Sequence, residues 1–422
     1  MVVGFIFTGQ LGCAQTQQAE IDHLHRPGQL LELDFERTFT PQQIDSFIAP
    51  LFAGFTQPQA LYSVDVYQAV ISSTYPDGSP ARAYVQVFLP QIPPQDVANQ
   101  SALQSSPRST QRPNPQELLP LYVFGPGSTG LLDVCRPSRE HEAGIRWGLY
   151  RAHVLSHAGQ GMAGMIPDYL GFRDPERYQY YMVAQAEAAV MLDSIRAFSS
   201  IRQELGFLLG EQTFNVVTGF SQGGHAAFAA GDFNQLYAPD IRVHGIIGFG
   251  PTTDPMQLML QFPSVAPMII FTYGQLYGEH IFDPLALLQG EFGEFLADDV
   301  LSQCVGGMQS TFPSRADHLF TPEFYRSLSE GTLDRDFPLV AFYLRLNSTG
   351  LRIRDIPVLI LQGTDDIVIF EPTQRVFVER LILQGVDVDY RVIEGQRHDT
   401  RQAGFQATQD WIWDLASSFS QP

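Results

Sequence analysis

The sequence predicts an α/β fold, in which a mostly parallel eight-stranded sheet carries helices on both faces and one mainly helical segment is inserted. Short, continuous apolar runs recur along the chain, which is typical of strands buried on both faces of a parallel sheet. Amphipathic segments of helical period separate these runs, and such alternation favours parallel pairing. Between residues 252 and 346 the alternation stops, and the uneven, partly helical sequence there indicates the insertion.

The first two expected strands form a hairpin at the antiparallel edge of the sheet, because both alternate in hydrophobicity and a turn signal at 75–79 separates them. The other six are buried apolar runs. The eight expected strands lie at 62–73, 83–89, 118–124, 162–166, 214–217, 243–249, 356–361 and 386–393.

The intervening segments predict helices and loops. Helices are expected at 41–52, 181–205, 372–383 and 403–417, and a further one starts at Gly224. Residues 90–115 are rich in Pro, Gln, Ser and Asn, which predicts an exposed loop. Residues 15–60 are polar and mixed apart from the helix at 41–52, so we assign them to an N-terminal extension without a strand.

The N-terminus predicts export. Residues 1–14 are apolar and end in small residues, like a secretory signal, although the basic leader is missing. The sequence Leu11-Gly12-Cys13 also resembles a lipoprotein cleavage site, so a lipid anchor on Cys13 is a second interpretation, and a frayed cytoplasmic terminus is a third. We therefore expect an extracytoplasmic protein, either secreted or periplasmic.

Charge and hydropathy exclude several partners. The chain has 45 acidic and 25 basic residues and a net charge of −20, so its field repels nucleic acid. The apolar stretch at 256–277 is long enough to cross a bilayer, but two glutamines and two prolines, Gln257, Gln261, Pro263 and Pro267, argue against a transmembrane helix. We expect no integral membrane span, and the stretch instead belongs to the inserted segment.

Cys13, Cys135 and Cys304 are the three cysteines of the chain, too few for a disulfide framework or a thiolate metal cluster. If Cys13 is removed or lipidated, the other two can pair in an oxidising compartment or remain as buried free thiols. A disulfide between them would fasten the inserted segment near the site described next.

Residues 219–223 carry the strongest chemical signal, a G-x-S-x-G sequence between an apolar strand and a helix-forming segment. A serine on such a sharp strand-to-helix turn holds strained backbone angles, and Gly219 and Gly223 leave room for the close approach of the chain. The positive end of the helix dipole also points at the turn. Ser221 is therefore the candidate nucleophile.

A serine nucleophile needs a base, and the base needs a carboxylate to orient it. His398 follows the last expected strand and is the candidate base, because no other histidine combines a loop position with a preceding buried strand. Asp365 and Asp366 follow the preceding strand, and the G-x-x-D spacing from Gly363 favours Asp366. Serine, acid and histidine in this chain order are expected for an α/β-hydrolase.

The oxyanion of such a reaction needs preorganised hydrogen-bond donors. We expect the backbone N–H of Gln222 to be the first, and Gly127 or Ser128, after the strand at 118–124, to supply the second. The alternative for Gly127 and Ser128 is a turn without a ligand role. No phosphate loop, metal-spaced histidine pair or dinucleotide fingerprint is present in the sequence, so we expect neither cofactor nor metal.

Several segments resemble the secretory lipases, the family of Candida lipase A-like enzymes and their bacterial relatives. Residues 219–227 resemble the family's elbow, 167–172 its P-D-Y-x-G segment, and 126–130 its H-G-T-T-G oxyanion loop, with Pro126 in place of histidine. The hairpin residues 64–67 and 77–78 are similar as well. The resemblance implies an α/β-hydrolase fold, serine ester hydrolysis and a helical cap inserted after the sixth strand.

These observations divide the chain into a leader (1–14), an extension (15–60), a hydrolase core (61–251 and 347–422) and a cap (252–346). The function predicted is a serine carboxylic-ester hydrolase, a lipase or esterase, that acts through an acyl-enzyme on an apolar substrate, either a small-molecule ester or a lipid ester. Peripheral lipid contact through the apolar cap is part of this hypothesis. The alternatives are a serine peptidase or aminopeptidase of the same fold, and a binding protein that has lost catalysis.

Overall fold

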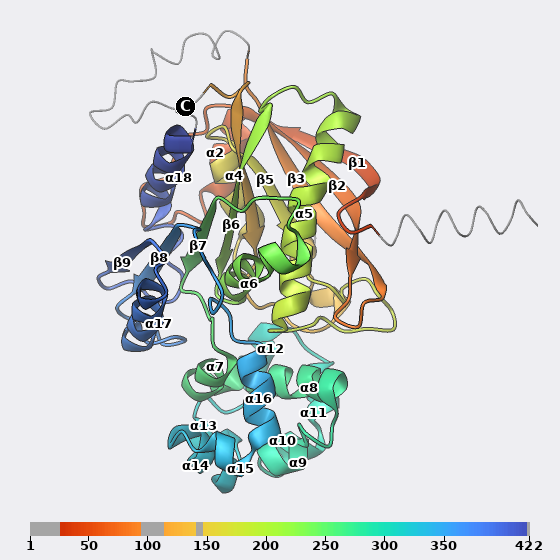
Figure 1. The fold of residues 1–422 in the computed structure, drawn as a ribbon, viewed down its shortest axis with the longest axis vertical. Helices are drawn as coiled ribbons and strands as arrows, with labels where there is room; N and C mark the ends of the chain where they lie inside the picture. Colours follow the sequence, from red (N-terminus) through yellow and green to blue (C-terminus); the bar gives the residue numbers. More distant parts are fainter. Residues whose placement is uncertain (1–25, 94–113, 141–146, 420–422) are drawn as a thin grey trace, which may run out of the picture.

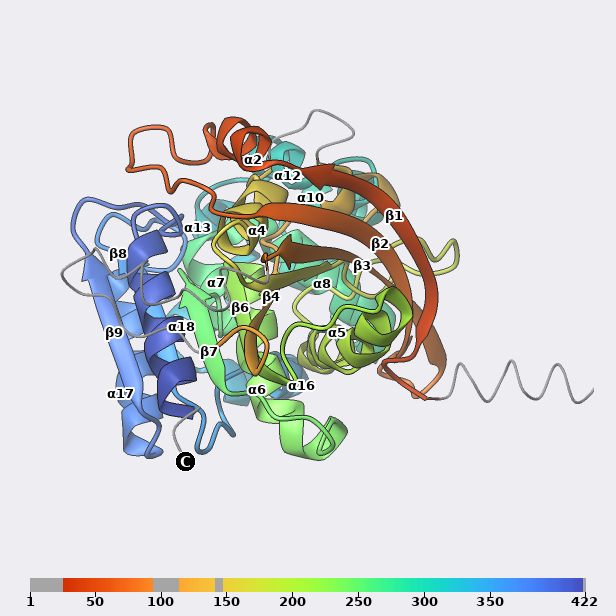
Figure 2. The same ribbon diagram turned by 90° about the horizontal axis from the view of Figure 1, so that it is seen from above.

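The computed structural model describes residues 26–93, 114–140 and 147–419, and within these ranges the chain forms one twisted, nine-stranded sheet (Figures 1 and 2). The strand order is β1-β2-β3-β5-β4-β6-β7-β8-β9. Pairing is antiparallel from β1 to β5 and parallel from β5 through β4 to β9. The strands are β1 (Leu30–Phe39), β2 (Ser63–Thr74), β3 (Pro80–Gln91), β4 (Leu118–Gly125), β5 (Ala163–Pro167), β6 (Gln212–Phe220), β7 (Gly245–Phe249), β8 (Val358–Gly363) and β9 (Val388–Ile393).

Helices cover both faces of this sheet. Along β4, Leu119, Leu121 and Val123 enter one apolar cluster, and the alternate residues Tyr122 and Phe124 enter the other, as the period of a strand requires. The first cluster contains α5 (Ala184–Leu205), α6 (Gln222–Tyr237) and α17 (Glu371–Leu383), and the second contains α2 (Pro41–Ile48), α4 (Tyr150–Ala158) and α18 (Phe405–Phe419). The predicted α/β architecture is confirmed.

The strand count differs from the prediction, because the segment assigned to an N-terminal extension contains β1. Leu31, Leu33 and Phe35 alternate with acidic residues there, which is a strand pattern. Because β1 is the edge strand and most of its residues are exposed or half-buried, its composition is that of a polar segment. The alternation of apolar and acidic residues could have predicted β1, but the polar composition of residues 15–60 as a whole led to the assignment without a strand.

Between β7 and β8 the chain forms helices and one isolated β-bridge, between Leu288 and Phe320, and we call residues 252–346 the helical insertion. Its helices gather at one end of the molecule, where the chain leaves β7 (Figure 1). They are α7 (Pro255–Gln261), η4 (Pro263–Val265), α8 (Ala266–Tyr277), α9 (Pro284–Leu287), α10 (Glu291–Glu294), α11 (Leu296–Val300), α12 (Val305–Thr311), α13 (Ala316–Leu319), α14 (Pro322–Ser329), α15 (Leu333–Asp336) and α16 (Pro338–Leu346). The insertion follows β7, which corresponds to the sixth predicted strand (243–249). The two numbers differ because β1 was not among the predicted strands.

The apolar stretch at 256–277 is divided into α7 and α8 at Phe262 and Pro263. Within the described ranges, no helix has the length and apolar character needed to span a bilayer. The predicted leader at 1–14, which includes Cys13, and most of the loop predicted at 90–115 lie outside the described residues.

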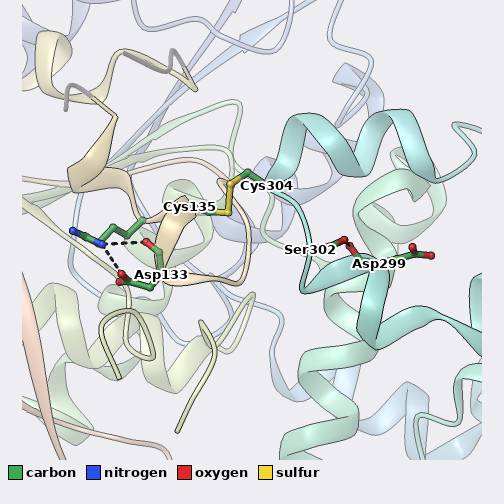
Figure 3. The surroundings of a disulfide bond; sticks show 6 residues. Asp133, Cys135, Asp299, Ser302 and Cys304 are labelled. Atoms are coloured by element: carbon green, nitrogen blue, oxygen red, sulfur yellow. Dashed lines mark hydrogen bonds and ion pairs between the residues drawn. A yellow bond between two sulfur atoms is a disulfide. The ribbon is translucent and has the colours of Figure 1, made fainter. Parts of the chain in front are cut away.

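A disulfide between Cys135 and Cys304 joins the helical insertion to the core (Figure 3). Cys135 ends the short helix η2 (Asp133–Cys135), and Cys304 is the N-cap of α12. Beside the disulfide, the backbone N–H of Val305 donates to the carbonyl oxygen of Thr129 at 2.8 Å. The structure therefore supports the disulfide over two free thiols, and it ties the insertion to the loop predicted to bind the oxyanion.

Replacing both cysteines by alanine should lower the stability of the protein markedly. The disulfide closes a loop with a sequence separation of 169 residues, and the chain-entropy treatment of such a loop gives an upper value of about 5 kcal/mol. Thermal unfolding and limited proteolysis would measure the loss, with Ser302→Ala as a neighbouring control. An unchanged midpoint in the double variant would contradict this expectation.

Candidate active site

Ser221 lies between the end of β6 and the start of α6 with strained backbone angles, φ 54° and ψ −116°. Serine rarely adopts positive φ, so the surrounding structure must hold the turn in place. A Cβ atom on Gly219 would overlap the carbonyl group of Gly223, and one on Gly223 would overlap that of Gly125. The two glycines of the motif are therefore required by the close packing of three backbone segments.

Gly219→Ala should prevent folding of the elbow, because the new methyl group would meet backbone atoms that cannot move aside. Soluble yield, circular dichroism and thermal unfolding would show the defect. Gly306→Ala is the matched control, since a Cβ atom there meets nothing within 4 Å and alanine is favoured in a helix by about 0.5–1 kcal/mol. A Gly219→Ala variant as stable as Gly306→Ala would refute the packing argument.

The candidate acid and base meet beyond the ends of β8 and β9. Nδ1 of His398 lies 2.8 Å from Oδ2 of Asp366, whose side chain is fully buried. A Cβ atom on Gly363 would overlap the carbonyl oxygen of Gln396, so glycine lets the two loops approach. Asp365 is exposed and its carboxylate accepts from the hydroxyl of Thr364, so of the two aspartates only Asp366 faces the histidine.

The carboxylate of Asp366 is fixed on all sides. Its Oδ1 accepts the backbone N–H groups of Val368 and Ile369, and its Oδ2 accepts the side-chain amide of Gln362. Burial alone raises the pKa of Asp366, but the bond to His398, the histidine charge and the two N–H groups outweigh it, so the pKa is lowered. Asp366 therefore stays ionised and holds the histidine with Nε2 free to act.

The lowered pKa of Asp366 makes stability depend on pH. Its folded pKa lies below the unfolded value of about 4, so this stabilisation is complete above that pH and is lost as pH falls through the folded pKa. The difference in unfolding free energy between wild type and Asp366→Asn should thus shrink below about pH 4. Urea titrations from pH 3 to 7 would measure it, with Asp365→Asn as control. A difference independent of pH would contradict the assignment.

The ring of His398 lies next to the elbow. Its centroid is 5.0 Å from that of Phe220, the residue before Ser221, and a Cβ atom on Gly250 would lie 3.0 Å from its Nδ1. The loop after β7 is joined to the elbow as well, since Ser221 N–H donates to the carbonyl of Phe249 at 3.1 Å. Within the described ranges, Nε2 of His398 is buried without a hydrogen-bond partner. A ring nitrogen without a partner, on a histidine that packs against the residue before Ser221, is what proton transfer from that serine would require.

A buried arginine supports this arrangement and was missed from the sequence. Arg401 is fully buried, pairs with Asp399, and donates to the carbonyl oxygen of Gly148 at 2.6 Å. Its guanidinium carbon lies 4.7 Å from the ring centroid of Phe220. Asp399 follows His398 directly but is engaged by Arg401, so it does not compete with Asp366. The usable signal was a pair of opposite charges, Asp399 and Arg401, two positions apart directly after the candidate histidine.

The residues predicted to bind the oxyanion flank the elbow. As the first residue of α6, Gln222 has a backbone N–H without a partner inside the helix. A Cβ atom on Gly127 would lie 2.9 Å from the ring of Phe220 and 2.9 Å from the hydroxyl of Tyr150, so the loop touches the elbow. The Oγ atom of Ser128 lies 2.8 Å from the hydroxyl of Tyr181. The structure thus brings both predicted donor segments beside Ser221.

The other buried histidines described have structural partners. His225 points away from the elbow toward Glu187 and Asn347, as expected from its helix position. His157 stacks on the ring of Tyr122, and the hydroxyl of Tyr122 lies 2.8 Å from Nε2 of His153. Burial lowers the pKa of His157 to about 3, so His157 is neutral. Over the described ranges, no group of three or more His, Cys, Asp or Glu side chains has the geometry to hold a metal ion.

Comparison with known proteins supports the fold and the family resemblance. The chain matches the family model of the secretory lipases over residues 145–259. A rice cell wall degrading esterase, LipA of Xanthomonas oryzae, superposes with a TM-score of 0.69 at 18% identity, covering 94% of this chain and 98% of the esterase. The fold is that of an α/β-hydrolase. The resemblance predicted from the sequence is confirmed.

Candida antarctica lipase A in its closed state has the same α/β-hydrolase fold, with a TM-score of 0.64 at 14% identity, covering 94% of this chain and 84% of the lipase. A search of curated proteins gave no significant match. At these identities the structures establish the fold, and together with the family match they support a hydrolase of the lipase or esterase kind.

Proposed function

We propose that this protein is a serine carboxylic-ester hydrolase, a lipase or esterase, with Ser221 as nucleophile, His398 as base and Asp366 as the group that orients the base. One observation carries the proposal: the phenylalanine before a strained serine at the head of α6 packs against a histidine that is held by a buried carboxylate and has a free Nε2. A binding protein without catalysis would not need this constellation.

The reaction follows from the positions of these groups. Ser221 Oγ attacks the ester carbonyl carbon as His398 Nε2 takes its proton, and the backbone N–H of Gln222 with Gly127 or Ser128 stabilises the oxyanion. Collapse of this intermediate breaks the bond to the alcohol, which leaves with the proton from His398, and an acyl-enzyme remains. Water, deprotonated by His398, then attacks the acyl carbon and releases the acid and Ser221.

The helical insertion favours an apolar substrate. On α16, Leu339, Phe342 and Leu346 have exposed fractions of 54%, 55% and 46% and lie on one helical face. Such a face suits a lipid or another greasy ester, and it supports peripheral lipid contact through the insertion, which we propose to be a cap over the site. We also propose an extracytoplasmic location, because the Cys135–Cys304 disulfide is stable in an oxidising compartment.

Ser221→Ala should abolish hydrolysis of p-nitrophenyl esters, a loss of at least about 10³-fold, and leave the fold intact. A fluorophosphonate probe should label the wild type at Ser221 and leave the variant unlabelled. Normal thermal unfolding of the variant is the control for folding. Retained hydrolysis in Ser221→Ala would refute the proposed nucleophile.

Substrate preference distinguishes the proposed esterase from the alternative, a serine peptidase of the same fold. Matched series of acyl esters and aminoacyl amides should show higher kcat/KM for the esters, because the exposed apolar face of α16 suits acyl chains. A preference for aminoacyl amides would replace the esterase proposal by the peptidase. Absence of labelling in the wild type would favour the inactive binding protein.

A further inference from the structure

A buried carboxylate behind the elbow, Glu187 in the first turn of α5, accepts hydrogen bonds from three directions. Its Oε1 accepts the backbone N–H of Met182 at 3.2 Å and the side-chain amide of Gln222 at 2.8 Å. Its Oε2 lies 2.5 Å from Nδ1 of His225. Glu187 is 1% exposed and His225 is fully buried. Neither group belongs to the proposed proton-transfer path.

The hydrogen-bond partners constrain the protons of this pair. Nε2 of His225 lies 2.6 Å from the carbonyl oxygen of Asn347, and a carbonyl only accepts, so Nε2 carries a proton. Since Met182 and Gln222 donate to Oε1 of Glu187, one further proton joins Oε2 of Glu187 to Nδ1 of His225. Whichever of these two atoms carries that proton, every polar group of the pair has a partner and the pair has no net charge.

A buried pair of this kind is weak evidence of a role in stability. Removing two charges from water costs several kcal/mol, and well-packed apolar residues of similar size are often at least as stabilising. The specific benefit is geometric, since three donors are fixed relative to one another. One of the three is the side chain of Gln222, the residue whose backbone N–H is the proposed oxyanion donor.

The same carboxylate also reaches the other side of the proposed oxyanion hole. Met182 has a positive φ of 55°, and its N–H is held by Glu187 while its carbonyl accepts the hydroxyl of Tyr273 at 2.7 Å. The preceding residue, Tyr181, is fully buried and its hydroxyl lies 2.8 Å from Oγ of Ser128. Burial raises the pKa of Tyr181, so its hydroxyl stays protonated and available for this bond.

We propose that Glu187, supported by His225, is a positioning residue that sets both walls of the oxyanion hole. It orients Gln222 directly and Ser128 through Met182 and Tyr181. This inference rests on the proposed function.

The pair also lies at the seam with the helical insertion. Asn347, which follows α16, accepts the N–H of Ala184 through its side chain and donates to the hydroxyl of Tyr277 at 2.8 Å. Because its carbonyl holds His225, the chain returning from the insertion completes the support of the elbow. A displacement of the insertion would therefore be transmitted to Gln222 through His225 and Glu187.

Two substitutions at Glu187 separate positioning from packing. Glu187→Gln keeps two acceptor lone pairs for Met182 and Gln222, and its amide can donate to a neutral His225, so kcat should stay within about threefold of wild type. Glu187→Leu removes every acceptor and should lower kcat by about 10- to 100-fold with KM within about twofold. Inhibition by an alkylboronic acid, which forms a tetrahedral adduct with the serine, should weaken in parallel with kcat.

A second pair of variants tests the same idea if Glu187→Leu folds poorly. In His225→Asn the side-chain amide takes the place of Nδ1 and keeps the contact with Glu187, and in His225→Gln it takes the place of Nε2 and keeps the contact with Asn347. Both leave a cavity, so thermal unfolding should drop similarly. Only His225→Gln should lose kcat and boronate affinity, by about tenfold or more relative to His225→Asn.

The inference would be overturned if the two Glu187 variants lost kcat equally, if the two His225 variants did so as well, and if these losses matched the losses of thermal stability. The role of the pair would then be structural. Unchanged kcat and boronate affinity in Glu187→Leu or His225→Gln would overturn the inference as well. Fluorophosphonate labelling of wild type separates the two proposals: an unlabelled, inactive wild type refutes the proposed function and this inference together, whereas a labelled wild type with unaffected variants refutes the inference alone.

Discussion

The contact between three glycine backbones, Gly125 at the end of β4, Gly219 in β6 and Gly223 in α6, is the constraint on which the site depends. No side chain fits between these segments, because a Cβ atom on Gly219 or Gly223 would overlap backbone atoms. The contact forces the chain to turn sharply at Ser221 and to enter α6 at once, and it brings the loop after β4 beside the turn. The same backbone contact therefore positions both the candidate nucleophile and the segments that carry the proposed oxyanion donors.

The acid and the base are placed by the sheet rather than by the elbow. Parallel strands β8 and β9 end at the same edge as β6, so the loops that carry Asp366 and His398 meet there. Their final position depends on side chains from the elbow itself. Phe220 lies against both the ring of His398 and the buried guanidinium of Arg401. A change at Phe220 would therefore disturb the base as well as the turn.

The helical insertion is fixed to this site by two different kinds of bond. The Cys135–Cys304 disulfide ties it to the segment after the oxyanion loop, and the carbonyl of Asn347 ties its returning end to His225. Both attachments lie within a few residues of proposed oxyanion groups. The part of the chain that faces the substrate in our proposal is thus also part of what holds the catalytic backbone in place.

The sequence by itself determined the alternation of strands and helices, the elbow at 219–223 and the chain order of Ser221, Asp366 and His398, because hydrophobic period and glycine spacing are local properties. The sequence did not lead to the prediction of β1, since an exposed edge strand has a polar composition. Only the tertiary structure decided between the disulfide and free thiols, and only it revealed Arg401 and the Glu187–His225 pair. These depend on contacts between residues far apart in the chain, such as the 122 positions between His225 and Asn347, which no local pattern records.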